Sequence, residues 1–276
     1  MAFSLIPAEI ANPWLFLLLG SASAALASLA KAGFGGSIGL LAVPMMIFAC
    51  GENAELAVGV MLPLLIATDY FAMISWWGQW ELRPVWLLLP GALVGVGMGW
   101  VVLWAIQRLG AQRQTDQANA VLMLCIGAIA IAFVALQAVR AIRSRPMRFR
   151  PVLWQAVPIG AAAGLTSTLA HVGGPVVSMY LLPQGLPKGK FVATTVLYYW
   201  IGNQVKLVPY FALSLINPGS LGASLALMPA VVVGVVLGVF LHRRVGQKQF
   251  TGIVYVLLAL AGAQLVFKAI QTLRAQ

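Results

Sequence analysis

The sequence predicts an all-α polytopic membrane protein made of two inverted-topology repeats, and three observations lead to this prediction. The first is composition, because 61% of the 276 residues are hydrophobic and only 8% are charged, whereas an ordinary soluble domain has roughly 25% charged residues. The second is a series of long uncharged runs, and the third is a set of motifs that recurs in both halves. A soluble enzyme, a nucleic-acid-binding domain and a disulfide-stabilised secreted module are therefore excluded.

The uncharged runs predict about 8–10 helical segments. A 22-residue run such as Val85–Ile106 is about 33 Å long as a helix, which is enough to cross a hydrocarbon core of about 30 Å. Two shorter segments follow paired glycines, and each is expected to be the return arm of a broken helical hairpin. In chain order the expected segments are Ile10–Ala30, Ser37–Cys50, Ala54–Trp76, Val85–Ile106, Ala118–Val139, Val152–Ala170, Val176–Leu182, Phe191–Leu213, Leu221–Leu241 and Gln249–Ala269.

Three motifs recur in the same order in the two halves, which predicts an internal duplication. Each repeat is expected to hold one hairpin broken at paired glycines, followed by three transmembrane helices. The expected division is a first transmembrane repeat at residues 1–143, a basic cytoplasmic hinge at 144–151 and a second repeat at 152–276. The recurring motifs are Gly35-Gly36 with Gly173-Gly174, P-x4-G-x3-G at 90–99 with 229–238, and Arg-x-Gly at 108–110 with 244–246.

The charge distribution predicts the orientation of the chain. All six acidic residues lie at or before Asp116, whereas thirteen of the seventeen Lys and Arg residues follow it. If both ends of each hairpin emerge on the same side, eleven basic residues of the loops lie inside and three lie outside, in agreement with the positive-inside rule. Each half then crosses the membrane an odd number of times, so the repeats are inverted. Inverted repeats with discontinuous helices are typical of secondary transporters, in which the substrate binds near the midplane.

The paired glycines predict a binding site at the hairpin tips. Unwound backbone leaves N–H and C=O groups without partners, and such breaks occur within a membrane only where they line a cavity or are buried in protein. The helices that begin after the breaks, at Ser37 and near Pro175, present N–H groups and a positive dipole end to an anion. The alternative is that the glycines only permit close packing of helices.

Ionisable residues inside a membrane span indicate function by default. Lys31 and His171 lie at the two hairpin tips, and Asp69 and Lys206 lie deep in later spans. Lys31 is expected either to neutralise an anion or to pair with Asp69. Asp69 and His171 are the candidate carriers of a coupling proton, although a structural imidazole is an equal alternative for His171.

Polar residues at matched depth in the two halves extend the expected site. Thr68-Asp69 aligns with Asn203-Gln204, which predicts two sides of one cavity, and Thr168 offers a hydroxyl unless it bonds its own helix backbone. No metal or cofactor is expected. The complete set of expected substrate-binding residues is Lys31, Gly35, Gly36, Ser37, Thr168, Gly173, Gly174, Asn203, Gln204 and Lys206.

Two segments resemble the paired Gly-rich motifs of the TauE/SafE sulfite exporter family. They read K-A-G-F-G-G-S-I-G-L-L-A-V-P at 31–44 and A-H-V-G-G-P-V-V-S-M-Y-L-L-P at 170–183, and the resemblance covers essentially the whole chain. In the second copy His171 stands where the family pattern usually has glycine. The resemblance implies transport of small sulfur-containing anions such as sulfite, sulfoacetate or other organosulfonates.

The expected function is therefore a secondary transporter, in the exporting direction, in a bacterial-type plasma (inner) membrane. Alternating access would come from rocking of one repeat against the other. A passive anion channel would use the same site and remains an open alternative. An intramembrane enzyme is less well supported, because the sequence has no paired carboxylates or metal-ligand spacing. The expected partners are the anion and the lipid bilayer, with no nucleic acid, and homo-oligomerisation is left open.

Overall fold

A computed structural model describes residues 5–36, 41–113, 115–143, 152–244, 260 and 263–274. These residues are mostly helical and contain no β-strand, and five of their helices are long and apolar enough to cross a membrane. The prediction of an all-α polytopic membrane protein is confirmed. Ser37, the expected hinge at 144–151 and most of the expected span Gln249–Ala269 lie outside the described residues.

The helices follow the expected order, and most of their bounds agree with the uncharged runs. The first half contains α1 (Pro13–Phe34), α2 (Ala42–Ala49), α3 (Ala54–Ser75), α4 (Leu82–Arg113) and α5 (Thr115–Arg143). The second half contains α6 (Leu153–Ala170), α7 (Gly174–Leu181), a 3-10 turn at Leu182–Gln184, α8 (Lys188–Ala212) and α9 (Pro218–Arg244), and residues 263–274 are also helical.

Three helices, α4, α5 and α9, extend past their expected runs at both ends. The runs Val85–Ile106 and Ala118–Val139 correspond to α4 and α5, which continue for several residues at both ends. The uncharged runs stop at the first polar residues, but backbone hydrogen bonding in a helix continues past the hydrocarbon core into the interfacial layer. Hydropathy therefore marks the apolar part of each span and not the end of the helix.

Both hairpin helices end in the same way. Gly35 follows α1 with a left-handed backbone (φ 64°), and the Gly36 N–H donates to the Ala30 carbonyl at 3.0 Å. His171 follows α6 with φ 52°, and the Val172 N–H donates to the Thr166 carbonyl at 3.3 Å. Each is a Schellman-type end, in which the left-handed residue stops the helix and satisfies its last carbonyls.

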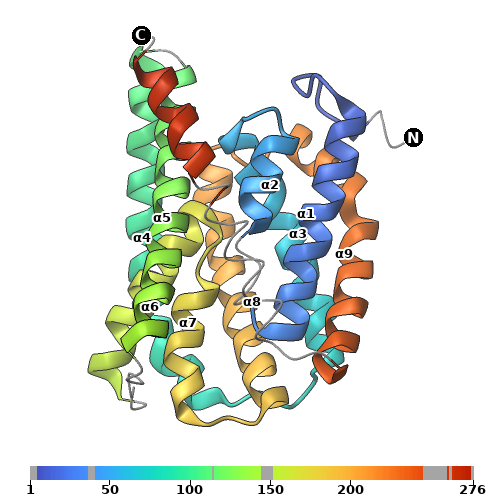
Figure 1. The fold of residues 1–276 in the computed structure, drawn as a ribbon, viewed down its shortest axis with the longest axis vertical. Helices are drawn as coiled ribbons and strands as arrows, with labels where there is room; N and C mark the ends of the chain where they lie inside the picture. The colour runs from blue at the N-terminus through green and yellow to red at the C-terminus, as the bar shows by residue number, and fades with distance from the viewer. Residues whose placement is uncertain are drawn as a thin grey trace.

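The two hairpins point in opposite directions in the molecule (Figure 1). The start of α1 and the connection from α2 to α3 lie at the upper end of the view, whereas α6 begins and α7 ends at the lower end. The 22 residues of α1 span about 33 Å, and the 8 residues of α2 span about 12 Å. The first hairpin therefore has one long arm and one short helical return arm.

The halves are interleaved, because each hairpin packs against a helix of the other half. The long arm α1 lies along α9, and α6 lies along α4 (Figure 1). In both pairs of helices the two backbones approach closely at a glycine. A Cβ on Gly95 of α4 would overlap the Ala161 carbonyl of α6, and one on Gly238 of α9 would overlap the Leu29 carbonyl of α1. The P-x4-G-x3-G motif thus serves close helix packing in both halves, and inverted symmetry itself stays a prediction.

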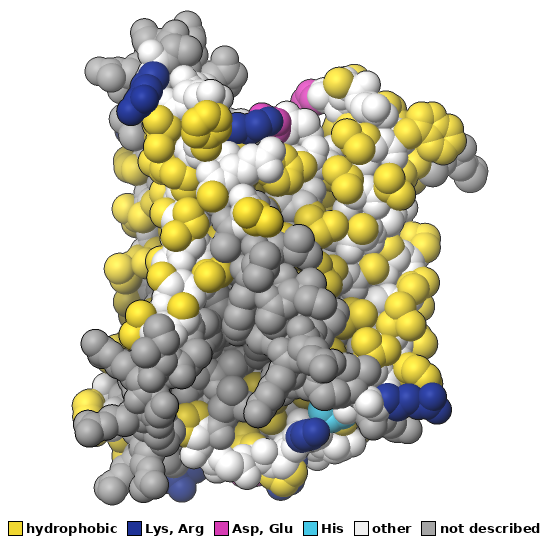
Figure 2. Space-filling model, viewed as in Figure 1, with side chains coloured by type: hydrophobic (Ala, Val, Ile, Leu, Met, Phe, Trp, Pro, Cys, Tyr) yellow, Lys and Arg dark blue, Asp and Glu magenta, His cyan; other side chains and the backbone are white. Residues whose placement is uncertain are grey.

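The outer surface fits a bilayer. Figure 2 shows hydrophobic side chains over much of the described surface between the two ends, with acidic groups at the upper end and basic groups at both ends. Trp14, Trp77 and Trp154 lie at helix ends and are at least 70% exposed, as expected for aromatic residues at the membrane interface. At the upper end Lys268, from the helical residues 263–274, pairs with Glu52 of the α2–α3 connection.

Candidate functional site

The tips of the two hairpins meet at two glycines. A Cβ added to Gly174 would overlap the backbone carbonyl of Gly36, so only glycine permits this approach. Beside the contact lies a cavity of about 40 Å³, which has room for roughly three water-sized spheres at about 10–15 Å³ each. We call it the tip cavity. It is lined by Ala27, Lys31, Gly36, Val43, Met61, Leu65, Ser167, His171, Gly174, Tyr199 and Asn203.

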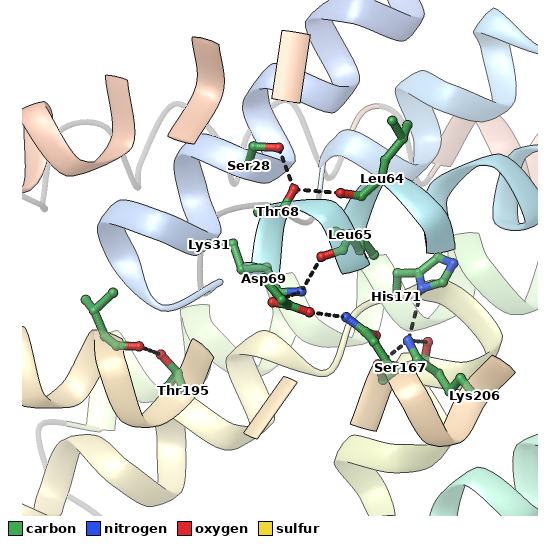
Figure 3. Close-up of polar contacts among 12 residues, drawn as sticks. Ser28, Lys31, Leu64, Leu65, Thr68, Asp69, Ser167, His171, Thr195 and Lys206 are labelled. Atoms are coloured by element: carbon green, nitrogen blue, oxygen red, sulfur yellow. Dashed lines mark hydrogen bonds and ion pairs between the residues drawn. The ribbon is translucent and has the colours of Figure 1, made fainter. Parts of the chain in front are cut away.

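One wall of the tip cavity carries a buried ion pair (Figure 3). The Lys31 Nζ lies 2.6 Å from Asp69 Oδ1, and the amide of Asn203 donates to Asp69 Oδ2 at 2.6 Å. Lys31 is 5% exposed and Asp69 is fully buried. The pair joins α1 to α3, and Asn203 joins it to α8 in the other half. Of the two expected roles of Lys31, pairing with Asp69 is the one present in this structure.

A second buried lysine, Lys206, contacts the lining residues Ser167 and His171 (Figure 3). Lys206 Nζ donates to Ser167 Oγ at 3.0 Å, to the Ser167 carbonyl at 3.3 Å and to His171 Nδ1 at 3.2 Å. Because Nδ1 accepts, the proton of a neutral imidazole is on Nε2, which donates to the Val58 carbonyl at 3.1 Å. The hydrogen-bond network thus assigns the tautomer of His171 and holds its ring between α3 and α8.

The position of His171 explains why a histidine replaces glycine in the second motif. By the geometry of the helix ends His171 is the counterpart of Gly35, two residues earlier than the Gly173 with which the motif alignment pairs Gly35. A left-handed backbone costs a non-glycine residue roughly 1–2 kcal/mol. The contacts of the ring with Val58 and Lys206 offset this cost, and they place a titratable group at the unwound tip.

The charges at the tip cavity do not balance. Lys31 and Lys206 are both buried, and Asp69 is the single acidic side chain that an ion pair places against either of them in the described part of the chain. The partners of Lys206 are neutral. With both lysines protonated, the cluster carries one positive charge that no carboxylate among the described residues pairs with. A buried charge of this kind is costly unless it is paired, which is the electrostatic condition for binding an anion.

The structure brings some of the expected residues together and not others. Lys31, Gly36, His171, Gly174 and Asn203 line the tip cavity, and Asp69 and Lys206 contact these lining residues. Ser37 lies outside the described residues. Gly35 and Gly173 lie behind the lining, where a Cβ would meet Thr195 and Ser167 respectively. Thr168 and Gln204 are absent from the lining.

The positions of Thr168 and Gln204 have simple causes. The hydroxyl of Thr168 donates to the Gly164 carbonyl of its own helix at 2.8 Å, which was the alternative expected for it. Gln204 follows Asn203 directly, and adjacent residues of a helix point about 100° apart. Asn203 faces the ion pair, so Gln204 is turned away from it. The role of each in substrate binding stays a prediction.

Two polar residues of the lining, Ser167 and Tyr199, are absent from the set of expected substrate-binding residues. Ser167 offers both its hydroxyl and its carbonyl to Lys206, and Tyr199 lies on α8 with its ring 5.2 Å from Lys31 Nζ. Tyr199, Asn203 and Lys206 have the spacing i, i+4, i+7, which puts them on one face of the helix. That spacing is the sequence signal that would have added Tyr199 to the site.

A larger cavity of about 250 Å³ lies between the start of α3 and the end of α8. Its lining includes Glu9, Asn53, Glu55, Gln107 and Asn217. We call it the acidic vestibule. Two carboxylates disfavour an anion, so the tip cavity is the better candidate for an anion site.

The long apolar helices and the broken hairpins define a multi-pass membrane protein. A family model described as sulfite exporter TauE/SafE matches residues 20–265. The match covers most of the chain, so this protein belongs to the TauE/SafE family, as its two Gly-rich motifs suggested. In comparisons with curated proteins and with solved structures, no protein matches the chain.

Proposed function

We propose that this protein is a secondary transporter that exports a small sulfur-containing anion, such as sulfite or an organosulfonate, across a bacterial-type plasma membrane. The observation that carries the proposal is the tip cavity, where two hairpins meet at glycine, Lys31 of the buried ion pair lines the cavity, and the buried Lys206 contacts its lining through Ser167 and His171. One bound monoanion would neutralise the unpaired charge. The small volume of the cavity favours a site for one small anion over a continuous water-filled pore.

The ion pair suggests how anion and proton transport would be coupled. An anion that enters the tip cavity competes with Asp69 for Lys31, since both bind the same ammonium group. Asp69 would then be a buried carboxylate without its cation, and such a group is neutralised by taking up a proton. In this scheme Asp69 carries the proton, and His171 positions Lys206 through Nδ1. Binding of the anion and binding of the proton would therefore favour each other.

The packing of the halves suggests how access would alternate. Each hairpin is fixed to a helix of the other half, α1 to α9 and α6 to α4, while the hairpin tips touch at Gly36 and Gly174. Rocking of one unit, made of a hairpin and its partner helix, would open the tip contact toward one side at a time. The predicted orientation places the basic ends of α8 and α9 in the cytoplasm.

A binding assay tests the site. Purified full-length protein in detergent is heated with sulfite, sulfoacetate, sulfate, thiosulfate, taurine or acetate at constant ionic strength. We expect sulfite or sulfoacetate to raise the melting temperature, because binding to the folded state stabilises it. Lys206→Met is expected to abolish the shift. Lys190→Met is the matched control, since Lys190 lies on the same helix with its side chain 51% exposed. Equal loss in both variants would contradict the site.

A flux assay tests the transport mechanism. Protein in proteoliposomes is expected to move the anion that binds, in a saturable manner that depends on the pH gradient. Asp69→Asn is expected to retain anion flux but to lose the accompanying proton movement. Proton movement that is unchanged in Asp69→Asn would refute the coupling scheme. Single-channel currents in a planar bilayer would instead identify a passive channel.

A further inference from the structure

One buried hydroxyl at the tip cavity has no partner within the described part of the chain. Tyr199 is 6% exposed, and its hydroxyl is buried without a hydrogen bond to any described residue. Buried polar groups are nearly always hydrogen-bonded, and each exception requires an explanation. Tyr210 on the same helix shows the usual arrangement, because its hydroxyl donates to the Thr168 carbonyl at 2.7 Å.

The hydroxyl end of Tyr199 lies at the break in the first hairpin. A Cβ placed on Gly36 would be 3.4 Å from Cε2 of the ring and 4.0 Å from Cζ, the atom that bears the hydroxyl. The ring also lines the tip cavity, and Lys31 Nζ lies 5.2 Å from its centroid. The free donor therefore lies between the ammonium group of Lys31 and the backbone of the hairpin tip.

One neighbouring ring packs directly against Tyr199. The Tyr198 ring packs edge-on against it, with centroids 5.3 Å apart, and Asn203 lies one helical turn further along α8, where it bonds Asp69. Tyr199 is thus fixed by its own helix and faces residues of the first half of the chain. A donor held in place without a partner is preorganised for an acceptor that arrives from outside.

We propose that Tyr199 is a substrate-binding residue whose hydroxyl donates a hydrogen bond to an oxygen of the bound anion. The inference rests on the proposed function, because it requires an anion in the tip cavity. It assigns the two halves different parts of the ligand shell. Lys31 contacts the anion from the first half, and Tyr199 contacts it from the second, so a bound anion would tie the halves together.

Tyr199→Phe tests this role, because it removes the hydroxyl and keeps the ring. A hydrogen bond to a charged group contributes more binding free energy than a hydrogen bond to a neutral group. We therefore expect the affinity for the anion to fall about tenfold or more. The melting temperature without anion should stay the same or rise, because an unsatisfied buried hydroxyl is lost. A purely structural hydroxyl would give the opposite sign, a lower melting temperature without anion.

Tyr198→Phe is the matched control, since it removes a hydroxyl from the adjacent buried ring, which is not part of the tip-cavity lining. Both variants and the wild type are titrated with sulfite and sulfoacetate. Weaker binding in Tyr199→Phe alone supports the inference. Wild-type affinity in Tyr199→Phe, or equal loss in both variants, overturns it while leaving the proposed function in place. Absence of binding to the wild type overturns the proposed function as well.

Discussion

The buried pair of Lys31 and Asp69 predicts a large and specific loss of stability when either partner is removed. Nζ and Oδ1 are 2.6 Å apart, and the two side chains are 7% and 0% exposed. Removal of one partner from such a pair typically costs about 3–5 kcal/mol, because the other charge is left buried and unpaired. At about 2–4 °C per kcal/mol for a chain of this size, Lys31→Met or Asp69→Asn should lower the melting temperature by roughly 6–20 °C.

A double-mutant cycle separates this pair from a general effect of charge removal. The double variant Lys31→Met/Asp69→Asn leaves neither charge, so its loss should be smaller than the sum of the single losses, with a coupling energy of about 1–3 kcal/mol. The control pair is Lys190 and Glu81, which are 3.4 Å apart and 51% and 43% exposed. An exposed pair contributes about 0–1 kcal/mol.

The assay is thermal unfolding of purified protein followed by tryptophan fluorescence. We expect coupling in the buried cycle and little or none in the exposed cycle. Additive losses in the Lys31 and Asp69 cycle, or losses no larger than those of the control pair, would refute the buried ion pair. The proposed competition between the anion and Asp69 would then have no basis.

Three further changes test other parts of the account. Gly174→Ala places a Cβ on the Gly36 carbonyl, and the resulting overpacking of about 1–3 kcal/mol should cut anion flux at least tenfold. Gly97→Ala, with open space around the added atom, should retain full flux and gain up to about 1 kcal/mol in stability; equal flux in the two variants would contradict the tip contact. Lys206→Met should lower the melting temperature by less than Lys31→Met, because it leaves neutral acceptors on Ser167 and His171 without a donor, at about 1–3 kcal/mol, but leaves no carboxylate without its partner; a loss as large as that of Lys31→Met would reveal an acidic partner. A single cysteine at position 145 should react with an impermeant thiol reagent only from the cytoplasmic side, and labelling from outside would reverse the predicted orientation.

The positions of the helices could be predicted because burial in lipid imposes long uncharged runs. The hairpin breaks could also be located, because paired glycines inside a hydrophobic segment interrupt the helical pattern of the sequence. The ends of α4 and α5 could not be predicted, because helical hydrogen bonds continue where hydropathy stops. The structural counterpart of Gly35 also differed from the motif alignment, since a histidine occupies the left-handed position in α6.

The sequence predicted how deep in the membrane the site residues lie, but not which of them contact one another. Matched depth placed Asn203 near Asp69, and the two do bond. Depth alone did not show that Thr168 bonds its own helix or that Gln204 turns away, because these outcomes depend on the direction of each side chain. Tyr199 was overlooked because a tyrosine in a hydrophobic span resembles any core aromatic residue until its hydroxyl is seen to lack a partner.

The central claim is that the tip cavity holds the transported anion. Selenite has the shape and charge of sulfite, and selenium gives an anomalous X-ray signal, so diffraction from crystals of the full chain soaked in selenite locates the anion directly. We predict a selenium peak in the tip cavity, beside the contact of Gly36 with Gly174, with a selenite oxygen within hydrogen-bond distance of the Tyr199 hydroxyl. A peak only in the acidic vestibule, beside Glu9 and Glu55, or no peak at a saturating concentration, would contradict it.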